Sequence, residues 1–391
     1  EVGRHLNIEL HTLSDIKEIS GEAGNFSVTL NQKARYIDID KCTGCGDCST
    51  VCPVSLASDF EQGMGDRTAV SRPYAQAVPG AFSISKKDKS PCTNACPGNV
   101  NAHGYVSMIG QGKYKEAMEI ITRTLPMPGV LGRICPHPCE DACRRAQVDS
   151  PLSICTLKRF AADQVDINDL TVPEITPRDE KVAMIGAGPA GLTAAYFLAL
   201  DGFNVTIFEA LPVGGGMLRV GIPDYRLPPS VLEKEIAWIQ KMGVEIQYDT
   251  VMGKDITVDS LMDEGFKSIF FGIGCHKDTK LGLAGEDEVE NVIPGVKFLR
   301  DAALGDMKEI KGNGSVIGGG DVAIDAARTA LRMGADKVSI LYRRTEAEMP
   351  ARDEEIEDAK EEAVDIQFLR APVEIVAKNG KLTGIKCIQM E

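Results

Sequence analysis

The sequence predicts an α/β fold, and three observations support this prediction. Two glycine-rich stretches, one at Lys181–Ala210 and one beginning at Ser315, each lie between an apolar run of strand length and a helix. A third feature, a group of ten cysteines between Cys42 and Cys155, precedes both stretches. Strand, glycine turn, helix and second strand are the parts of a Rossmann-type unit that binds a dinucleotide. We therefore expect two such units with a cysteine-rich region before them.

Composition limits the classes of function that the chain can have. With 391 residues, 43% of them hydrophobic and 26% charged, it reads as a globular protein of two to three domains. A net charge of -14 argues against nucleic acid or an anionic membrane surface as partner. No apolar run approaches the roughly 18 residues that a membrane helix needs, and no secretory signal is visible. We therefore expect a cytoplasmic protein without membrane insertion.

The first glycine-rich stretch has every part of a dinucleotide-binding fingerprint. Val182–Ile185 reads as a strand, and Gly186, Gly188 and Gly191 supply G-x-G-x-x-G. The following helix would direct free N–H groups and its positive dipole end toward phosphates. Glu209 ends the second strand about 20 residues later, where a carboxylate binds a ribose hydroxyl. The alternative is a glycine-rich turn that binds no ligand.

The second stretch differs from the first at the end of its second strand. Gly318, Gly320 and Ala323 give G-x-G-x-x-A, again after a strand and before a helix. The next strand ends in Arg343 and Arg344, where an acid is expected for a ribose 2′-hydroxyl. Arginine accommodates a 2′-phosphate, so the pattern favours NADPH over NADH; a solvated basic pair is the alternative. We interpret the acidic helix after it, residues 346–366, as a solvated face.

The first cysteines have the spacing of a bacterial ferredoxin. Cys42, Cys45, Cys48 and Cys52 follow C-x-x-C-x-x-C-x-x-x-C-P, a run that wraps around a [4Fe–4S] cube. Zinc is the alternative, but zinc sites favour two separated C-x-x-C pairs. The fourth ligand stays open, because the cysteine before proline serves another cluster in two-cluster ferredoxins. Cys96, also followed by proline, could complete this cube.

Six more cysteines lie in a segment of helical spacing. They are Cys92, Cys96, Cys135, Cys139, Cys143 and Cys155. Six thiols suffice for one complete cube with two left over, or for two cubes with other ligands, of which His137 is one candidate. Cys139 and Cys143 are four residues apart, so we expect them on one helix face, with Cys155 just before another helix.

From about Cys92 to its end, the chain resembles the small (β) subunit of glutamate synthase and its relatives. The motifs are PCTNACP, GRICPHPCEDAC, GAGPAG, GGGMLRVGIPDYRLP, GIGCHKDTKLGLAGED, GGGDVAID and LYRR. The resemblance implies FAD at the first fingerprint, NADPH at the second and [4Fe–4S] clusters in the helical domain. The implied FAD positions are Gly186, Gly188, Pro189, Ala190, Gly191, Glu209, Gly215, Gly216, Met217 and Leu218. The implied NADPH positions are Gly318, Gly319, Gly320, Asp321, Val322, Arg343 and Arg344.

The chain departs from that family in three places. Two cysteines that commonly precede PCTNACP are replaced by SISKKDKS, which puts one of the two clusters in doubt. The family resumes its FAD domain after the NADPH domain, whereas this chain stops at Glu391. Residues 1–85, with KCTGCGDC and PYAQAVPGAFSI, are instead similar to the A subunit of heterodisulfide reductase. We expect an internal piece of a longer fused protein, with strands at both ends that lack their sheet partners.

The complete prediction is an α/β protein with two Rossmann-type dinucleotide-binding domains, preceded by a ferredoxin-like [4Fe–4S] segment and a helical iron–sulfur domain. The expected division is residues 1–40 (strands completing an upstream flavin domain), 41–85 (ferredoxin-like), 86–170 (helical iron–sulfur), 178–300 (FAD-binding) and 301–391 (NAD(P)H-binding, incomplete). We interpret 213–228, rich in glycine and proline, as a loop too irregular to contain an element.

The predicted function is electron transfer from NADPH, or NADH, through FAD and [4Fe–4S] clusters to another redox subunit. The resemblances imply heterodisulfide-reductase-like or hydrogenase/dehydrogenase-like partners. No acid–base residue is assigned, because hydride transfer between stacked rings needs none. One alternative is a glutamate-synthase-type subunit that donates electrons from NADPH. Another, from a different class, is an iron–sulfur or zinc assembly scaffold with a vestigial nucleotide fold.

Overall fold

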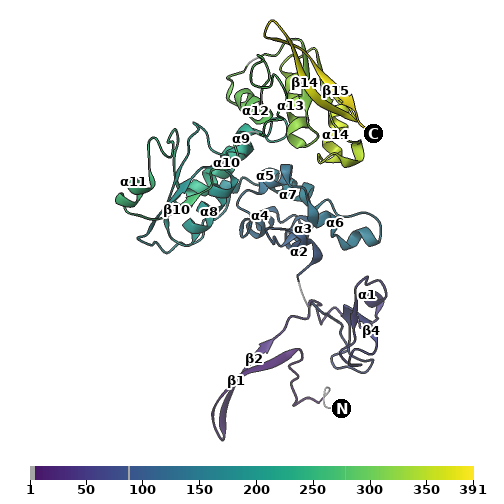
Figure 1. Cartoon of the computed structure of the whole chain (residues 1–391). Coiled ribbons are helices and arrows are strands. Elements are labelled where there is room, and N and C mark those ends of the chain that lie inside the picture. The colour runs from purple at the N-terminus through teal and green to yellow at the C-terminus, as the bar shows by residue number, and fades with distance from the viewer. Residues whose placement is uncertain (1–4, 87–88, 278, 308) are drawn as a thin grey trace. The chain divides into compact units, whose positions relative to one another are not determined.

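The computed structural model describes residues 5–86, 89–277, 279–307 and 309–391 (Figure 1). The chain forms two compact units, and each consists of two separate stretches of sequence. The first unit comprises Glu1–Pro97 and Pro138–Leu152, and the second comprises Gly98–His137 and Ser153–Glu391. The helical region that we predicted as one domain, residues 86–170, is therefore shared between the two units.

The first unit is built from short antiparallel hairpins and single helical turns. Its strands are β1 (Ser14–Glu22), β2 (Asn25–Gln32), β3 (Ser55–Ala57), β4 (Asp66–Thr68), β5 (Val70–Ser71) and β6 (Ser83–Ile84). They pair as β1–β2, β3–β4 and β5–β6. Its helices are α1 (Asp47–Thr50), α2 (Pro91–Ala95), α6 (Pro138–Asp141) and the 3₁₀ turn η2 (Arg144–Gln147). The first strand begins at Ser14.

The second unit opens with a small helical bundle. Its members are α3 (Ala102–Gly110), α4 (Tyr114–Thr122), α5 (Pro128–Ile134), α7 (Ile154–Gln164) and η3 (Ile167–Asp169). Tyr105, Met118 and Ile121 are fully buried between these helices. Helices α5 and α7 lie so close that a Cβ at Gly132 would come within 2.7 Å of the Cα of Arg159. The helical spacing that we predicted for this part of the sequence is confirmed by these helices.

A four-stranded parallel sheet contains the first glycine-rich stretch. Its strand order is β10 (Phe266–Phe271), β7 (Lys181–Ile185), β8 (Asn204–Phe208) and β9 (Glu245–Gln247). Its helices are α8 (Pro189–Leu200), α9 (Met217–Val220), α10 (Pro229–Lys241) and α11 (Val258–Asp263). α8 contacts β7 and β8. Ala183 and Ile185 pack with Phe208, Leu261 and Phe266 in the core. The strands β7 and β8 and the helix α8 lie where the sequence predicts them.

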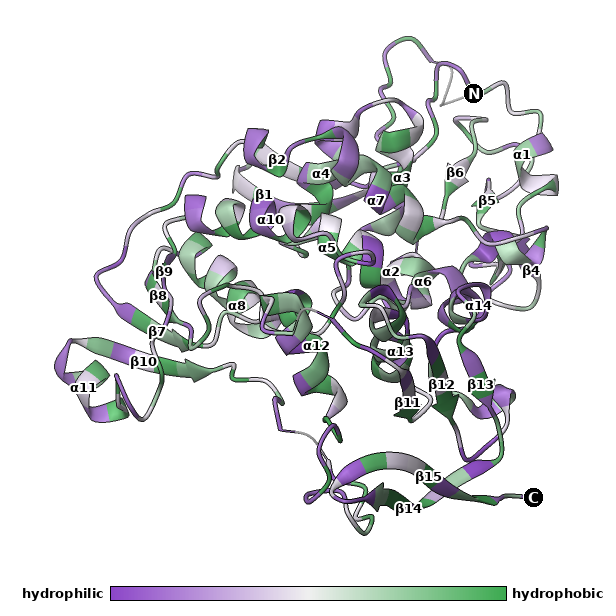
Figure 2. Cartoon of the chain, turned by 90° about the horizontal axis from the view of Figure 1, so that it is seen from above, coloured by the Kyte–Doolittle hydropathy of each residue, from purple (hydrophilic) through white to green (hydrophobic). Residues whose placement is uncertain are grey.

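A three-stranded parallel sheet contains the second stretch. Its order is β11 (Asn313–Ile317), β12 (Lys337–Leu341) and β13 (Asp365–Gln367). Its helices are α12 (Gly295–Leu304), α13 (Asp321–Arg332), η4 (Glu346–Glu348) and α14 (Asp353–Glu361). Figure 2 shows β12 mostly in the green of hydrophobic residues, and Val338 and Ile340 of this strand are fully buried. The predicted boundary between residues 300 and 301 falls within α12, which packs against α13.

The terminal strands form two separate two-stranded hairpins, and the expectation that they lack further sheet partners stays a prediction. β1 pairs with β2, and β14 (Arg370–Lys378) pairs with β15 (Lys381–Gln389). Each pair is antiparallel and joined by a short turn, so each satisfies its inner backbone hydrogen bonds locally.

Candidate cofactor and iron–sulfur sites

The first glycine turn joins β7 to α8 by a very close approach of backbone to backbone. Gly186 has φ 104°, a conformation that favours glycine. A Cβ at Gly191, in the first turn of α8, would collide with the carbonyl oxygen of Gly186. α8 starts on Gly188, with Pro189 in its first turn, so its first N–H groups have no partner within the helix. The turn therefore offers the donors and the space that a pyrophosphate needs.

A second glycine loop lies against the first. The N–H of Gly215 donates to the carbonyl of Ala187 over 2.7 Å. A Cβ at Gly216 would lie 2.9 Å from the Cα of Gly188, so the second loop leaves no room for a side chain at this position. Helix α9 begins at Met217, directly after Gly216. The prediction that this stretch contains no element is wrong: the glycines bring the backbone into contact, and a single helical turn then begins.

Glu209 extends β8 and reaches back to the first glycine turn. The side chain is 6% exposed. One carboxylate oxygen accepts the N–H of Ala187 over 2.6 Å, and the other accepts that of Leu211 over 2.8 Å. A carboxylate oxygen accepts more than one hydrogen bond, so the group keeps capacity for a ribose hydroxyl. The structure thus brings the two glycine loops and Glu209 together, and these residues fit an FAD.

The second glycine turn follows β11 and is covered by a segment from farther along the chain. Gly318 has φ 135°, and a Cβ at Gly319 would lie 2.6 Å from the ring of Tyr342. The N–H of Ala351 donates to the carbonyl of Gly319 over 3.0 Å. α13 then begins at Asp321, so its N-terminus lies at the carboxyl edge of the sheet, where dinucleotides bind.

Arg343 and Arg344 follow β12 at the same edge of the sheet. Strands β11 and β12 are parallel neighbours, so the residues after each strand lie on one side. Both arginines are exposed, and within the described residues neither side chain makes an ion pair. Two uncommitted guanidinium groups beside a glycine turn fit a nucleotide that carries a 2′-phosphate.

In the ferredoxin-like segment, three of the four predicted ligands surround one hollow. Cys42, Cys45 and Cys48 line a cavity of about 260 Å³ together with backbone from Gly44 and Gly46. Cys52 does not line this cavity, and its thiol donates to the carbonyl of Val54 over 3.9 Å. Three thiols around one hollow fit three corners of a cube, and the fourth ligand stays a prediction.

Four of the helical-region cysteines belong to the first unit. Cys92 lies on α2 and Cys96 ends it, while Cys139 lies on α6, which packs against α2. Cys143 lies beyond α6, which ends at Asp141, and has an extended backbone. The prediction that Cys139 and Cys143 share one helix face is therefore wrong. A spacing of four implies a shared face only where the helix continues through both residues.

The other two, Cys135 and Cys155, belong to the second unit. α5 ends at Ile134 and is followed directly by Cys135, and Cys155 lies within the first turn of α7 and not before it. The Cys155 thiol is buried and donates to the carbonyls of Leu131 and Gly132 over 3.5 and 3.6 Å. A hydrogen bond from Cys155 lowers the pKa of Cys135 to about 5; burial opposes this, and the charge of Lys158 adds to it. The thiolate, which is the metal-binding form, is therefore favoured at Cys135.

Three of the cysteines surround a hollow of the kind that an iron–sulfur cube occupies. Among the residues that the structure describes, no three His, Cys, Asp or Glu side chains converge closely enough to hold one metal ion. Zinc needs four ligands within about 2.3 Å of one point. In a cube each thiolate binds its own iron, so the thiols surround a larger volume, such as the hollow at Cys45.

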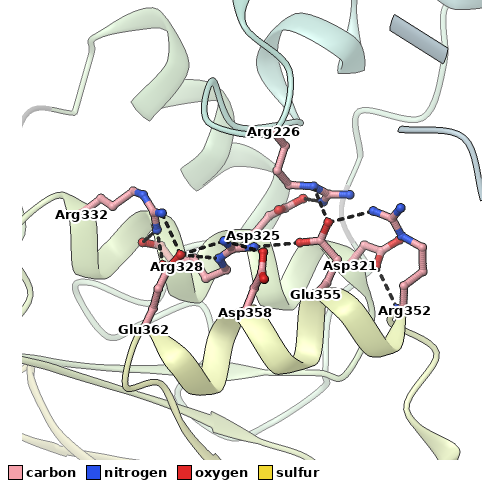
Figure 3. A network of polar contacts seen from close by, with 9 residues as sticks. All are labelled: Arg226, Asp321, Asp325, Arg328, Arg332, Arg352, Glu355, Asp358 and Glu362. Atoms are coloured by element: carbon pink, nitrogen blue, oxygen red, sulfur yellow. Dashed lines mark hydrogen bonds and ion pairs between the residues drawn. The ribbon is translucent and has the colours of Figure 1, made fainter. Parts of the chain in front are cut away.

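Two groups of charged residues that hold the second unit together were not predicted from the sequence. Glu235 on α10 accepts hydrogen bonds from the first turn of α5. Arg226, from the loop before α10, pairs with Asp325 and Glu355 on α13 and α14 (Figure 3). The interpretation of the acidic helix as a solvated face is therefore wrong for Glu355, which is 9% exposed. No local pattern marks these residues, because their partners are distant in sequence.

The fold and these sites define a protein with 4Fe–4S domains and two dinucleotide-binding folds, the architecture of an oxidoreductase family. The family model described as pyridine nucleotide-disulphide oxidoreductase matches residues 180–389, and the chain belongs to this family. A model described as dihydropyrimidine dehydrogenase domain II, 4Fe-4S cluster, matches residues 74–170. A 4Fe-4S binding domain model matches residues 36–57. These matches confirm the predicted fold class and the predicted iron–sulfur and dinucleotide cofactors.

Curated relatives make the comparison more particular. The chain is 46% identical over 327 residues to the NADP(+)-dependent formate dehydrogenase subunit beta of Moorella thermoacetica, covering 77% of this chain and 46% of that one. It is 38% identical over 371 residues to the NADPH-Fe(3+) oxidoreductase subunit beta of Geobacter sulfurreducens, covering 93% and 54%. It is 32% identical over 316 residues to the glutamate synthase [NADPH] small chain of Halomonas elongata, covering 76% and 66%. The chain thus spans about half the length of the first two relatives.

Within the described part of the chain, every helix is too short or too polar to cross a membrane.

Proposed function

We propose that this chain carries electrons from NADPH through FAD to [4Fe–4S] clusters and on to a partner redox subunit. When bound, the nicotinamide supplies a hydride to the flavin, and the flavin passes electrons singly to the clusters. One observation carries the proposal: two glycine turns, each at the carboxyl edge of a parallel sheet, belong to one compact unit. The second of these turns has free arginines beside it.

The chain's own residues supply binding and orientation. Gly186, Gly188 and Gly216 leave the backbone open to the FAD pyrophosphate, and Glu209 would accept from a ribose hydroxyl. At the second turn, the N-terminus of α13 would receive the NADPH pyrophosphate. Arg343 and Arg344 would hold the 2′-phosphate with charge-assisted hydrogen bonds.

The cysteines would hold the clusters that receive electrons from the flavin. Cys42, Cys45 and Cys48 would hold a ferredoxin-type cube, and the helical-region cysteines would hold one or two more. The first two relatives are named as beta subunits, which supports a partner subunit for this chain. We infer a dehydrogenase-like or heterodisulfide-reductase-like partner, the latter from the resemblance of residues 1–85.

The test is anaerobic reduction of the purified chain. The protein should contain FAD, iron and sulfide, and NADPH should bleach the flavin bands and then the broad iron–sulfur absorption. Omission of nucleotide is the control. A protein without flavin, or one whose flavin stays oxidised with both NADPH and NADH, would contradict the proposal.

A second candidate is electron donation to an amidotransferase, favoured by the similarity to the Halomonas elongata small chain. The 4Fe–4S model at residues 36–57 supports an additional electron carrier in front of that shared region. The two functions are separated by Cys45→Ser. Loss of electron transfer to an added one-electron acceptor, with flavin reduction intact, favours the first candidate.

A further inference from the structure

A short loop segment, Tyr225 and Arg226, joins the two dinucleotide-binding folds. It lies between α9 and α10, a few residues after the predicted FAD positions Met217 and Leu218. An Nη of Arg226 pairs with Oδ2 of Asp325 on α13 over 2.6 Å, and its Nε pairs with Oε1 of Glu355 on α14 over 2.9 Å. The three side chains are 11%, 4% and 12% exposed. Figure 3 shows Arg226 reaching down to both helices.

Tyr225 makes a second contact with the same helix. Two guanidinium groups lie over its ring, with the Cζ of Arg328 4.8 Å and that of Arg332 3.9 Å from the ring centre. Burial raises the pKa of Tyr225 to about 12, so the phenol stays neutral. Cations over an aromatic face are attracted to it, most strongly where water is excluded. The loop is thus held to α13 by two adjacent side chains.

The partners of Arg226 are themselves held by further ion pairs. Glu355 also accepts from Arg328 over 2.8 Å and from Arg352 over 2.9 Å. Arg328 in turn pairs with Asp358 and Glu362 (Figure 3). We call the nine residues drawn there the Arg226 network: Arg226, Asp321, Asp325, Arg328, Arg332, Arg352, Glu355, Asp358 and Glu362. Side chains that share several ion pairs restrict one another. The network therefore holds a single arrangement more firmly than an isolated ion pair on the surface does.

The network extends to the second glycine turn. Asp325 lies one helical turn after Asp321, the first residue of α13. Asp321 accepts the backbone N–H of Arg352 over 3.4 Å, and Arg352 also bonds Glu355. The same two helices therefore hold Arg226 and flank the place where NADPH is expected. If Arg226 shifted, the expected NADPH site would move relative to the loop that carries the predicted FAD positions.

We propose that Arg226 is a positioning residue for hydride transfer, because it fixes the NADPH-binding fold against the loop that carries the FAD positions. This inference rests on the proposed function. Hydride transfer requires the two rings to be stacked at close range, so a small displacement slows it strongly. The planar guanidinium meets two carboxylates from two directions, a geometry that lysine reproduces only in part.

The experiment compares Arg226→Met and Arg226→Lys with Lys360→Met in the full chain. Lys360 is the matched control, because it lies on α14, carries the same charge and pairs with Glu346 on the surface, where the two side chains are 42% and 52% exposed. Three quantities are measured by stopped flow: flavin reduction at saturating NADPH, the Kd for NADPH, and the long-wavelength charge-transfer absorbance of stacked nicotinamide and flavin.

We expect Arg226→Met to slow flavin reduction at least about tenfold and to weaken the charge-transfer band. The Kd for NADPH should change by less than about threefold, because the binding residues remain. Reduction by dithionite should be unaffected, Arg226→Lys should be intermediate, and Lys360→Met should behave like wild type. Equal rates in Arg226→Met and Lys360→Met would overturn the inference, as would parallel losses in rate and NADPH affinity.

Asp325→Asn tests the same contact from the other side. It should slow flavin reduction by a similar factor, and the double variant Arg226→Met/Asp325→Asn should be no slower than either single variant, because one contact is lost in all three. Independent, multiplying losses would overturn the inference. A wild-type chain that neither NADPH nor NADH reduces would overturn the proposed function and this inference together. If the wild-type chain is reduced by NADPH and the Arg226 variants are reduced at the same rate, this inference is overturned and the proposed function stands.

Discussion

At the scale of single residues, we propose that Arg343 and Arg344 decide which nicotinamide nucleotide is preferred. Both follow β12 and are exposed, and no carboxylate takes their place at the strand end. The 2′-phosphate of NADPH carries up to about two negative charges, which guanidinium groups hold with charge-assisted hydrogen bonds. NADH offers only a hydroxyl at the same position.

We expect the double change Arg343→Ala/Arg344→Ala to weaken NADPH much more than NADH. Each lost charged contact costs about 1.5 to 3 kcal/mol, or about ten- to hundredfold in affinity. The measurement is the Kd and the rate of flavin reduction with each nucleotide, at low and high salt, because screening should weaken NADPH more. A wild type that prefers NADH, or a variant that loses both nucleotides equally, would show that this role is wrong.

Cys45 is the most informative single thiol, because it lines the hollow in the ferredoxin-like segment. Cys45→Ser should lower the iron content by about four atoms per chain, the content of one cube. Iron and acid-labile sulfide are measured, with Cys275→Ser as control, since Cys275 is exposed and lies outside both cysteine groups. Unchanged iron and sulfide in the Cys45 variant would refute the assignment.

At the scale of elements, one carboxylate joins the helical bundle to the first dinucleotide fold. Both oxygens of Glu235 on α10 accept N–H groups from the first turn of α5, from Gly129 over 2.5 Å and Val130 over 3.0 Å. α5 ends at Ile134, directly before Cys135, so the contact also positions a predicted cluster ligand. Burial raises the pKa of Glu235 to about 7, against these two hydrogen bonds and the charge of Arg133.

This raised pKa predicts the sign of a pH effect on stability. The unfolded carboxyl, with a pKa of 4.5, loses its proton before the folded one, whose pKa is about 7. The folded state therefore binds more protons between these values, and the stabilising contribution falls as pH rises through them. At about 1.4 kcal/mol per pKa unit, up to about 3 kcal/mol should be lost by pH 8.

The measurement is urea unfolding from pH 5 to pH 8, followed by the fluorescence of Trp238 on the same helix. The difference between wild type and Glu235→Gln isolates this group, and it should shrink as pH rises. Glu235→Gln should be less stable at pH 5, because one N–H of α5 then faces an amide N–H₂ group. Glu233→Gln, exposed on α10, is the control. A difference that stays constant with pH would contradict the prediction.

At the scale of the whole molecule, the cofactors determine how many electrons the chain accepts. A flavin takes two electrons and each cube takes one, and we expect one cube in the ferredoxin-like segment and at least one in the helical region. Anaerobic titration with dithionite should therefore consume at least about four electrons per chain. Cys45→Ser should consume about one fewer. An end point at two electrons would mean that the flavin is the only redox group.

Local features of the chain were predictable because their causes are local. The strands before Gly186 and Gly318, the helices after them and the cysteine spacing at Cys42 are all encoded within a few residues. Prediction failed where a helix ended unexpectedly or a partner was distant. Cys143 lies outside α6, and α9 begins inside a stretch rich in glycine and proline. Neither boundary follows from periodicity alone.

The sequence by itself determined the class of protein, its two glycine turns and its iron–sulfur ligand types, since these depend on residue chemistry at short spacing. Only the tertiary structure decided what joins the folds. Arg226 meets Asp325 across 99 positions, and Glu235 meets Gly129 across 106. In the sequence, Arg226, Asp325 and Glu235 are ordinary charged residues on loops and amphipathic helices. Burial makes these residues important for the structure, because a charged group removed from water is costly unless another group in the fold pairs with it.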